Sequence, residues 1–88
     1  MLKNIPDIPD ILQKMSQACP VANKVSVTFD SEKPNVITFH WYYKIAKRGY
    51  VYSFETNFLA VYTAEIIHII QTNIIKLKVQ MKFLRENQ

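Results

Sequence analysis

The side chains of this sequence best suited to acid–base catalysis or metal binding are two histidines, one cysteine and seven acids. His40 and Glu55 are expected to face each other on neighbouring strands, as a proton-shuttling pair or as an ordinary cross-strand charge pair. His68 has no second metal ligand three or four residues further along the chain, and a structural zinc site needs four ligands. Because the chain has one glycine, a glycine-rich phosphate loop is excluded. We therefore expect no enzymatic activity, no metal and no cofactor.

A basic surface with an aromatic side chain in its middle is the stronger candidate site. Residues 1–35 carry four bases and four acids, whereas residues 36–88 carry seven bases and three acids, so the net charge of +4 belongs to the second part. Such a face can hold phosphates and stack a base, although lysines on an open sheet also keep it from pairing with other sheets. The candidate partner-binding residues are His40, Tyr42, Lys44, Lys47, Arg48, Lys76, Lys78, Gln80 and Lys82.

Length and composition indicate one small domain spanning residues 1–88. Hydrophobic residues make up 49% of the chain, which is enough for a core. Cys19 is the only cysteine, so no disulfide can form within the chain and a reducing, cytoplasmic location is expected. The first ten residues lack the apolar run of a signal peptide, and polar residues interrupt the apolar stretch 58–75, so no membrane span is expected.

The first half of the chain predicts a helix followed by two strands. Apolar residues at helical spacing indicate a helix over residues 8–18, with Asp7 as its cap and Pro20 after its end. Alternating apolar and polar residues predict a strand over 25–29, and the polar segment 30–35 predicts a turn.

The strongest strand pattern covers residues 36–45, and a third strand follows over residues 50–56. We expect a four-residue loop between them, in which Gly49 can take a positive φ. This loop places the large apolar side chains on one face, which is expected to form the core. The cross-strand pairs that follow from it are Ile45–Tyr50, Tyr43–Tyr52, Trp41–Phe54 and His40–Glu55.

The segment from Asn57 to Leu84 has neither proline nor glycine and begins with a helix predicted over 57–71. Residues 74–83 follow two patterns. Strict alternation of apolar and polar residues favours a final strand, with the lysines outward. The alternative is a continued helix with a 3–4 repeat, formed by Ile67, Ile70, Ile74, Leu77, Met81 and Leu84.

The predicted fold class is therefore α+β in the order α-β-β-β-α-β, with both helices on the aromatic face of an antiparallel meander. The alternative order is α-β-β-β-α. In element order, residues 8–71 resemble double-stranded-RNA-binding domains and the small Alu-RNA-binding proteins of the signal recognition particle. That resemblance implies a lysine cluster where the second helix begins, but residues 56–60 carry no base.

These features predict a non-enzymatic protein-interaction module that forms a homodimer and presents a basic sheet face and its last edge strand to a partner. The partner would be a second copy or an acidic protein, and neither a membrane nor a small-molecule substrate is expected. The alternative is binding of RNA or single-stranded DNA through the basic sheet face.

Overall fold

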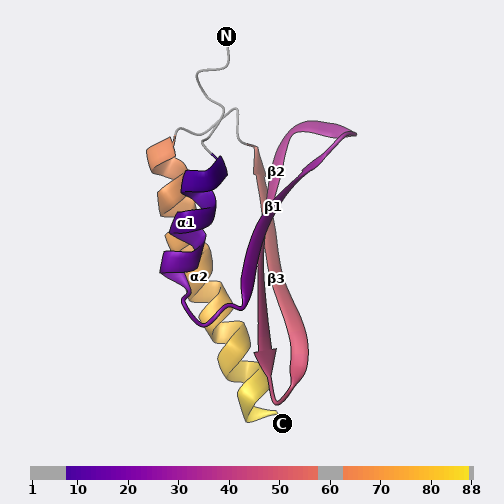
Figure 1. The fold of residues 1–88 in the computed structure, drawn as a ribbon, viewed down its shortest axis with the longest axis vertical. Helices are drawn as coiled ribbons and strands as arrows, with labels where there is room; N and C mark the ends of the chain where they lie inside the picture. The colour runs from indigo at the N-terminus through magenta and orange to yellow at the C-terminus, as the bar shows by residue number, and fades with distance from the viewer. Residues whose placement is uncertain (1–7, 58–62, 88) are drawn as a thin grey trace.

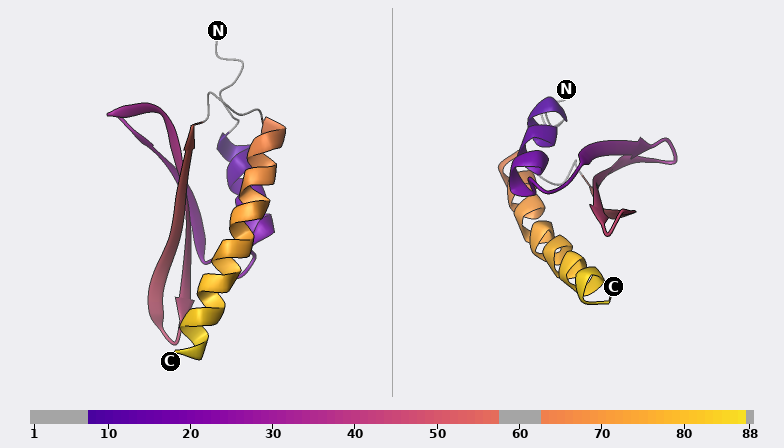
Figure 2. Two further views of the ribbon diagram at one scale, coloured as in Figure 1. Left: turned by 180° about the vertical axis from the view of Figure 1, so that it is seen from behind. Right: turned by 60° about the horizontal axis from the view of Figure 1, so that its bottom comes forward.

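The computed structural model describes residues 8–57 and 63–87, which form a three-stranded antiparallel sheet with two helices on one face (Figure 1, Figure 2). The predicted α+β class is confirmed, and of the two predicted element orders the alternative, α-β-β-β-α, is the one observed. The strands follow one another in space in the order β1-β2-β3. The elements are α1 (Ile8–Ala18), β1 (Lys24–Asp30), β2 (Lys33–Ile45), β3 (Arg48–Asn57) and α2 (Thr63–Glu86).

The first helix, α1, has the bounds that its apolar spacing predicts. Ile11 and Met15 lie one turn apart and are both buried against the sheet and α2. The helix ends where the N–H of Cys19 donates to the carbonyl of Met15 at 3.2 Å, just before Pro20. Cys19 is itself buried, so it serves as a small hydrophobic residue of the core. The predicted cap, Asp7, lies outside the described residues.

Strand β2 forms the middle of the sheet, and its side chains alternate between the two faces. The side chains of one face are buried beneath the helices, and those of the other face point away from them. This alternation confirms the predicted aromatic core face. The buried residues of β2 are Ile37, Phe39, Trp41, Tyr43 and Ile45.

The turn between β1 and β2 is shorter than the predicted polar segment 30–35, because β2 already begins at Lys33. Asp30 pairs with Lys33 across the turn. The Oδ1 atom of Asp30 accepts the backbone N–H of Glu32 at 2.9 Å, an aspartate-stabilised turn that reverses the chain within two residues.

The predicted register of the β2–β3 hairpin is wrong by two residues. Trp41 pairs with Tyr52, and His40 pairs with Ser53 rather than with Glu55. The loop contains two residues, Ala46 and Lys47, instead of four. Because the error is an even number of residues, every side chain still lies on its predicted face.

The two-residue loop explains the observed register. Ala46 and Lys47 have φ angles of 52° and 70°, and two consecutive positive φ angles define the tight turn whose twist matches that of paired strands. Gly49, which was expected to take the positive φ, lies within β3 and does not. The register also stacks Phe39 on Phe54, with ring centroids 4.8 Å apart.

The predicted final strand over residues 74–83 is wrong, because α2 continues as one helix to Glu86. The predicted second helix also begins too early, since Asn57 still belongs to β3. Residues 58–62 of that prediction lie outside the described part of the chain.

The helical geometry accounts for the misleading alternation. Residues two apart on a helix project about 200° apart, so they lie on opposite sides. Leu77 and Met81 are buried in the core, whereas Ile75, Val79 and Phe83 are exposed. The apolar residues at every second position therefore belong to two different faces of one helix.

The core lies between the aromatic face of the sheet and the two helices. The Trp41 side chain is fully buried, and its Nε1–H donates to the carbonyl of Met15 at 3.1 Å. Its ring lies 5.7 Å from that of Phe54. This single side chain therefore links α1 to β2 and β3.

Candidate interaction surface

The predicted basic surface is divided between two sides of the molecule. Residues 74–83 lie on α2, which packs on the aromatic face of the sheet (Figure 2), so their lysines do not share a surface with the opposite sheet face. Gln80 faces the sheet rather than solvent, where it contacts Tyr43. The outer sheet face retains His40, Tyr42 and Lys44, the hairpin carries Lys47 and Arg48, and α2 exposes Lys76, Lys78 and Lys82.

His40 is held by hydroxyl groups on the outer sheet face. Its Nε2 lies 2.9 Å from the Oγ1 of Thr28, and its Nδ1 lies 2.7 Å from the Oγ of Ser53. The expected partner Glu55 instead forms an exposed ion pair with Lys33, with 3.8 Å between Nζ and Oε1. Because both ring nitrogens already have partners on neighbouring strands, the imidazole links the three strands and does not form the predicted pair with a carboxylate.

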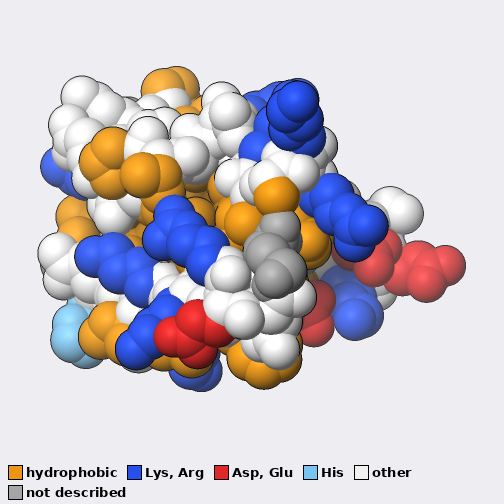
Figure 3. Space-filling model, turned by 90° about the horizontal axis from the view of Figure 1, so that it is seen from below, with side chains coloured by type: hydrophobic (Ala, Val, Ile, Leu, Met, Phe, Trp, Pro, Cys, Tyr) orange, Lys and Arg blue, Asp and Glu red, His pale blue; other side chains and the backbone are white. Residues whose placement is uncertain are grey.

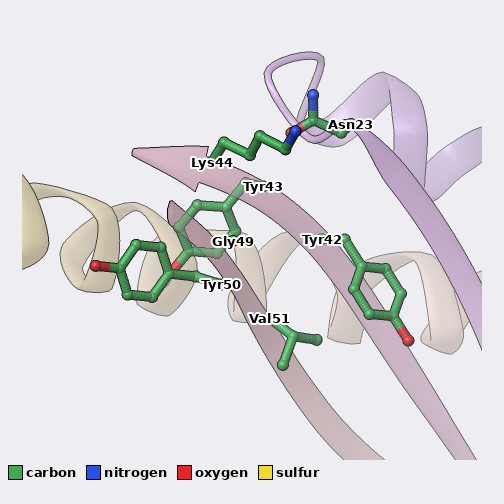
Figure 4. A pocket seen from close by; sticks show the side chains of 7 residues that line it. All are labelled: Asn23, Tyr42, Tyr43, Lys44, Gly49, Tyr50 and Val51. Carbon is green, nitrogen blue, oxygen red and sulfur yellow. The ribbon is translucent and has the colours of Figure 1, made fainter. Parts of the chain in front are cut away.

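A shallow pocket of about 290 Å³ lies on the sheet near the hairpin (Figure 4). The pocket is open beside Gly49, which has no side chain to fill the space. A Cβ atom at this position would meet nothing within 4 Å. Tyr42 and Val51 are paired across the strands and point the same way, and the Nζ of Lys24 lies 5.9 Å from the Tyr42 ring centroid. Among the described residues, the lining contains no acid, histidine or cysteine. It consists of Asn23, Tyr42, Tyr43, Lys44, Gly49, Tyr50 and Val51.

Two polar contacts fix the rotation of α2 on the sheet. The Tyr52 hydroxyl donates to the Oδ1 of Asn73 at 2.8 Å, and the Gln80 amide donates to the Tyr43 hydroxyl. Burial raises the pKa of Tyr52 above its ordinary value. Because these contacts lie two turns apart on the helix, they determine which side of α2 faces away from the sheet.

That side carries three large apolar residues, which we call the outward stripe: Ile75, Val79 and Phe83. They are 66%, 64% and 62% exposed, and they are spaced four residues apart, so they lie in one row along the helix. Isolated exposed apolar residues are common, but an aligned row on a helix whose other side is already buried is a candidate contact surface.

Basic residues border the outward stripe on both sides. At about 100° per residue, Lys76 projects beyond one border, and Lys78, Lys82 and Arg85 project beyond the other. All four are exposed, and this half of α2 extends past the end of α1 (Figure 1). Seen from below, basic side chains lie beside patches of hydrophobic surface (Figure 3).

The outward stripe was not predicted from the sequence, although its signal was present. A helix continued through residue 84 places Ile75, Val79 and Phe83 away from the 3–4 repeat, and this misfit favoured the strand. The misfit is itself the signal of a helix with two apolar faces. Among residues 8–57 and 63–87, no group of three or more histidine, cysteine, aspartate or glutamate side chains is arranged to hold a metal ion.

In the part of the chain that the structure describes, no helix is both long enough and apolar enough to cross a membrane. Comparison with known proteins finds no matching family model, no matching curated protein and no matching solved structure.

Proposed function

We propose that this chain is a non-enzymatic protein-interaction module that binds its partner through the outward stripe of α2. The exposure of Ile75, Val79 and Phe83 carries the proposal, because they form one row on the side of α2 opposite the core. A helix with apolar residues on two opposite sides is typical of a helix covered from both sides. The sheet covers one side, and a partner would cover the other.

The observed fold changes which surface could join the two copies of the expected homodimer. Residues 74–83 supply no edge strand, so a second copy cannot pair with them as one, while α2 and the edges of β1 and β3 remain available to it. The oligomeric state is accordingly one of the quantities that the experiments below measure.

Nucleic-acid binding has less support than protein binding. The expected basic sheet face loses Lys76, Lys78 and Lys82 to α2, whereas Lys24 and Lys44 remain on it. A stripe of three exposed apolar side chains fits a protein surface better than a phosphate backbone.

A reducing compartment is part of the same proposal. It is supported by the single cysteine of the chain, Cys19, which is buried in the core and has no second cysteine to pair with. A cytoplasmic location is consistent with that chemistry.

The test uses matched triple variants of the full chain. In the stripe variant, Ile75, Val79 and Phe83 are each replaced by Gln. In the control variant, three other exposed apolar residues, Val21, Phe29 and Val51, are each replaced by Gln. Circular dichroism first establishes that both variants remain folded.

Proteins retained from nuclease-treated native extract are identified, purified and recombined with each variant. We expect a purified partner to bind the unmodified chain and the control at least about tenfold more tightly than the stripe variant, since a few central side chains supply most interface energy. Equal affinity for the stripe variant and the unmodified chain would refute the proposed surface. Loss of every partner after nuclease treatment would favour the nucleic-acid alternative.

A further inference from the structure

We propose that the occupant of the outward stripe is an amphipathic helix of a partner protein whose apolar face is bordered by acidic side chains. This inference rests on the proposed function and specifies the chemistry of the partner. It follows from the charges that border the stripe, from its dimensions and from the residues at its two ends.

The bordering charges are almost entirely of one sign. Lys76 lies on one border, and Lys78, Lys82 and Arg85 lie on the other, all with exposed side chains. Among the described side chains of α2, Glu86 is the one acid, and it is the last residue of the helix. A helix that docks along the stripe would therefore place its own border residues beside four cations, and carboxylates at those positions complement them.

The same charges disfavour a second copy of this chain. In an antiparallel pair centred on Val79, Ile75 would pack on the partner's Phe83, and the lysine borders of the two helices would face each other. No acid on these borders offsets the repulsion, since Glu86 lies beyond the stripe. A parallel pair would likewise bring the basic borders together.

The dimensions of the stripe also require the cations to take part. From Ile75 to Phe83 the helix rises about 12 Å. Three side chains along about 12 Å of helix can bury less surface than the roughly 800 Å² that each partner contributes to a standard interface. The long aliphatic stems of the bordering lysines can extend the apolar contact while their ammonium groups pair with carboxylates.

The ends of the stripe favour a protein helix over an anionic lipid surface. Thr72 is exposed one turn before Ile75, and Glu86 is exposed one turn after Phe83. A carboxylate at the end of the row would be repelled by anionic headgroups, whereas a helix of defined length can stop short of it.

The test uses the full chain and three fluorescent synthetic helical peptides that share one leucine-rich apolar face. Their border residues are glutamate in the first peptide, glutamine in the second and lysine in the third. Binding is measured by fluorescence anisotropy at low and high salt. A charge-reversed chain, in which Lys76, Lys78 and Lys82 are each replaced by Glu, serves as the matched variant because all three side chains are exposed.

We expect the unmodified chain to bind the glutamate peptide about tenfold more tightly than the glutamine peptide, since each exposed ion pair is weak and four act together. This preference should shrink at high salt, and the charge-reversed chain should prefer the lysine peptide. If the unmodified chain binds all three peptides with equal affinity and the triple-glutamine stripe variant binds none of them, the acidic partner is overturned but the proposed function stands. Binding that the stripe variant retains would overturn both. No binding to any of the three peptides would overturn the acidic helical partner and leave the proposed function to its own test.

Two further measurements examine the other occupants. Sedimentation of the chain alone at high micromolar concentration is expected to show a monomer. A dimer that the stripe variant loses would identify a second copy as the occupant and overturn the acidic partner. Stripe-dependent binding to phosphatidylserine vesicles, without binding to the glutamate peptide, would overturn it in favour of a membrane surface.

Discussion

Leu77 and Val79 lie two residues apart on α2 but have opposite surroundings. Leu77 is fully buried in the core, whereas Val79 is 64% exposed on the outward stripe. Leu77→Ala should therefore lower the free energy of unfolding by about 2–5 kcal/mol, the range for truncating a buried leucine. Val79→Ala should change it by no more than about 0.5 kcal/mol, because little buried surface is lost and alanine favours the helix.

Urea denaturation followed by circular dichroism measures both changes. With a slope of about 1 kcal/mol per molar urea for a chain of this size, Leu77→Ala should lower the midpoint by roughly 2 M or more. If that variant is too unstable to fold, Leu77→Val provides a smaller change of about 1 kcal/mol. Equal losses for Leu77→Ala and Val79→Ala would refute the helical arrangement, because a strand would bury both side chains on one face.

Three further substitutions test the hairpin and the helix–sheet contact. Lys47→Gly should raise the free energy of unfolding by about 0.5–1 kcal/mol, since glycine accepts the φ of 70° without steric cost. The control Lys44→Gly, within β2, should lower the free energy of unfolding. A lower urea midpoint for Lys47→Gly would contradict the assigned turn conformation. Tyr52→Phe should cost about 1 kcal/mol through the lost bond to Asn73. Because burial raises the pKa of Tyr52 in the folded state, its contribution is complete below its ordinary pKa of about 10 and is lost as the pH rises through the folded value. Above pH 10 the Phe variant should thus lose stability less steeply than the unmodified chain, and parallel pH profiles would refute this assignment.

The face of each side chain in the sheet could be predicted from the sequence, but the pairing of the strands could not. Alternation in β2 determines that Phe39, Trp41 and Tyr43 share one face, whatever the partner residues are. The loop length depends on whether Ala46 and Lys47 accept positive φ angles, which neither residue type favours. Pairing across the aromatic core imposes this conformation, and local sequence carries no signal of it.

The end of the chain could not be assigned because two patterns coincide there. The core row of Ile74, Leu77 and Met81 and the outward stripe together place an apolar residue at every second position from 75 to 83. A test of periodicity treats these residues as one set, whereas the folded helix divides them between two surroundings. The same holds for the candidate site. The exposed lysines could be predicted from the sequence, but the surface on which they lie could not.

The position of α2 after all three strands has a consequence for synthesis of the chain. The aromatic face of the sheet is built from strands that are made before α2, and its cover includes the 24 residues of α2. At about 5–20 residues per second, translation of α2 takes roughly 1–5 s. Trp41 and its neighbours therefore cannot be fully covered until α2, the last of the five described elements to be made, has joined the sheet.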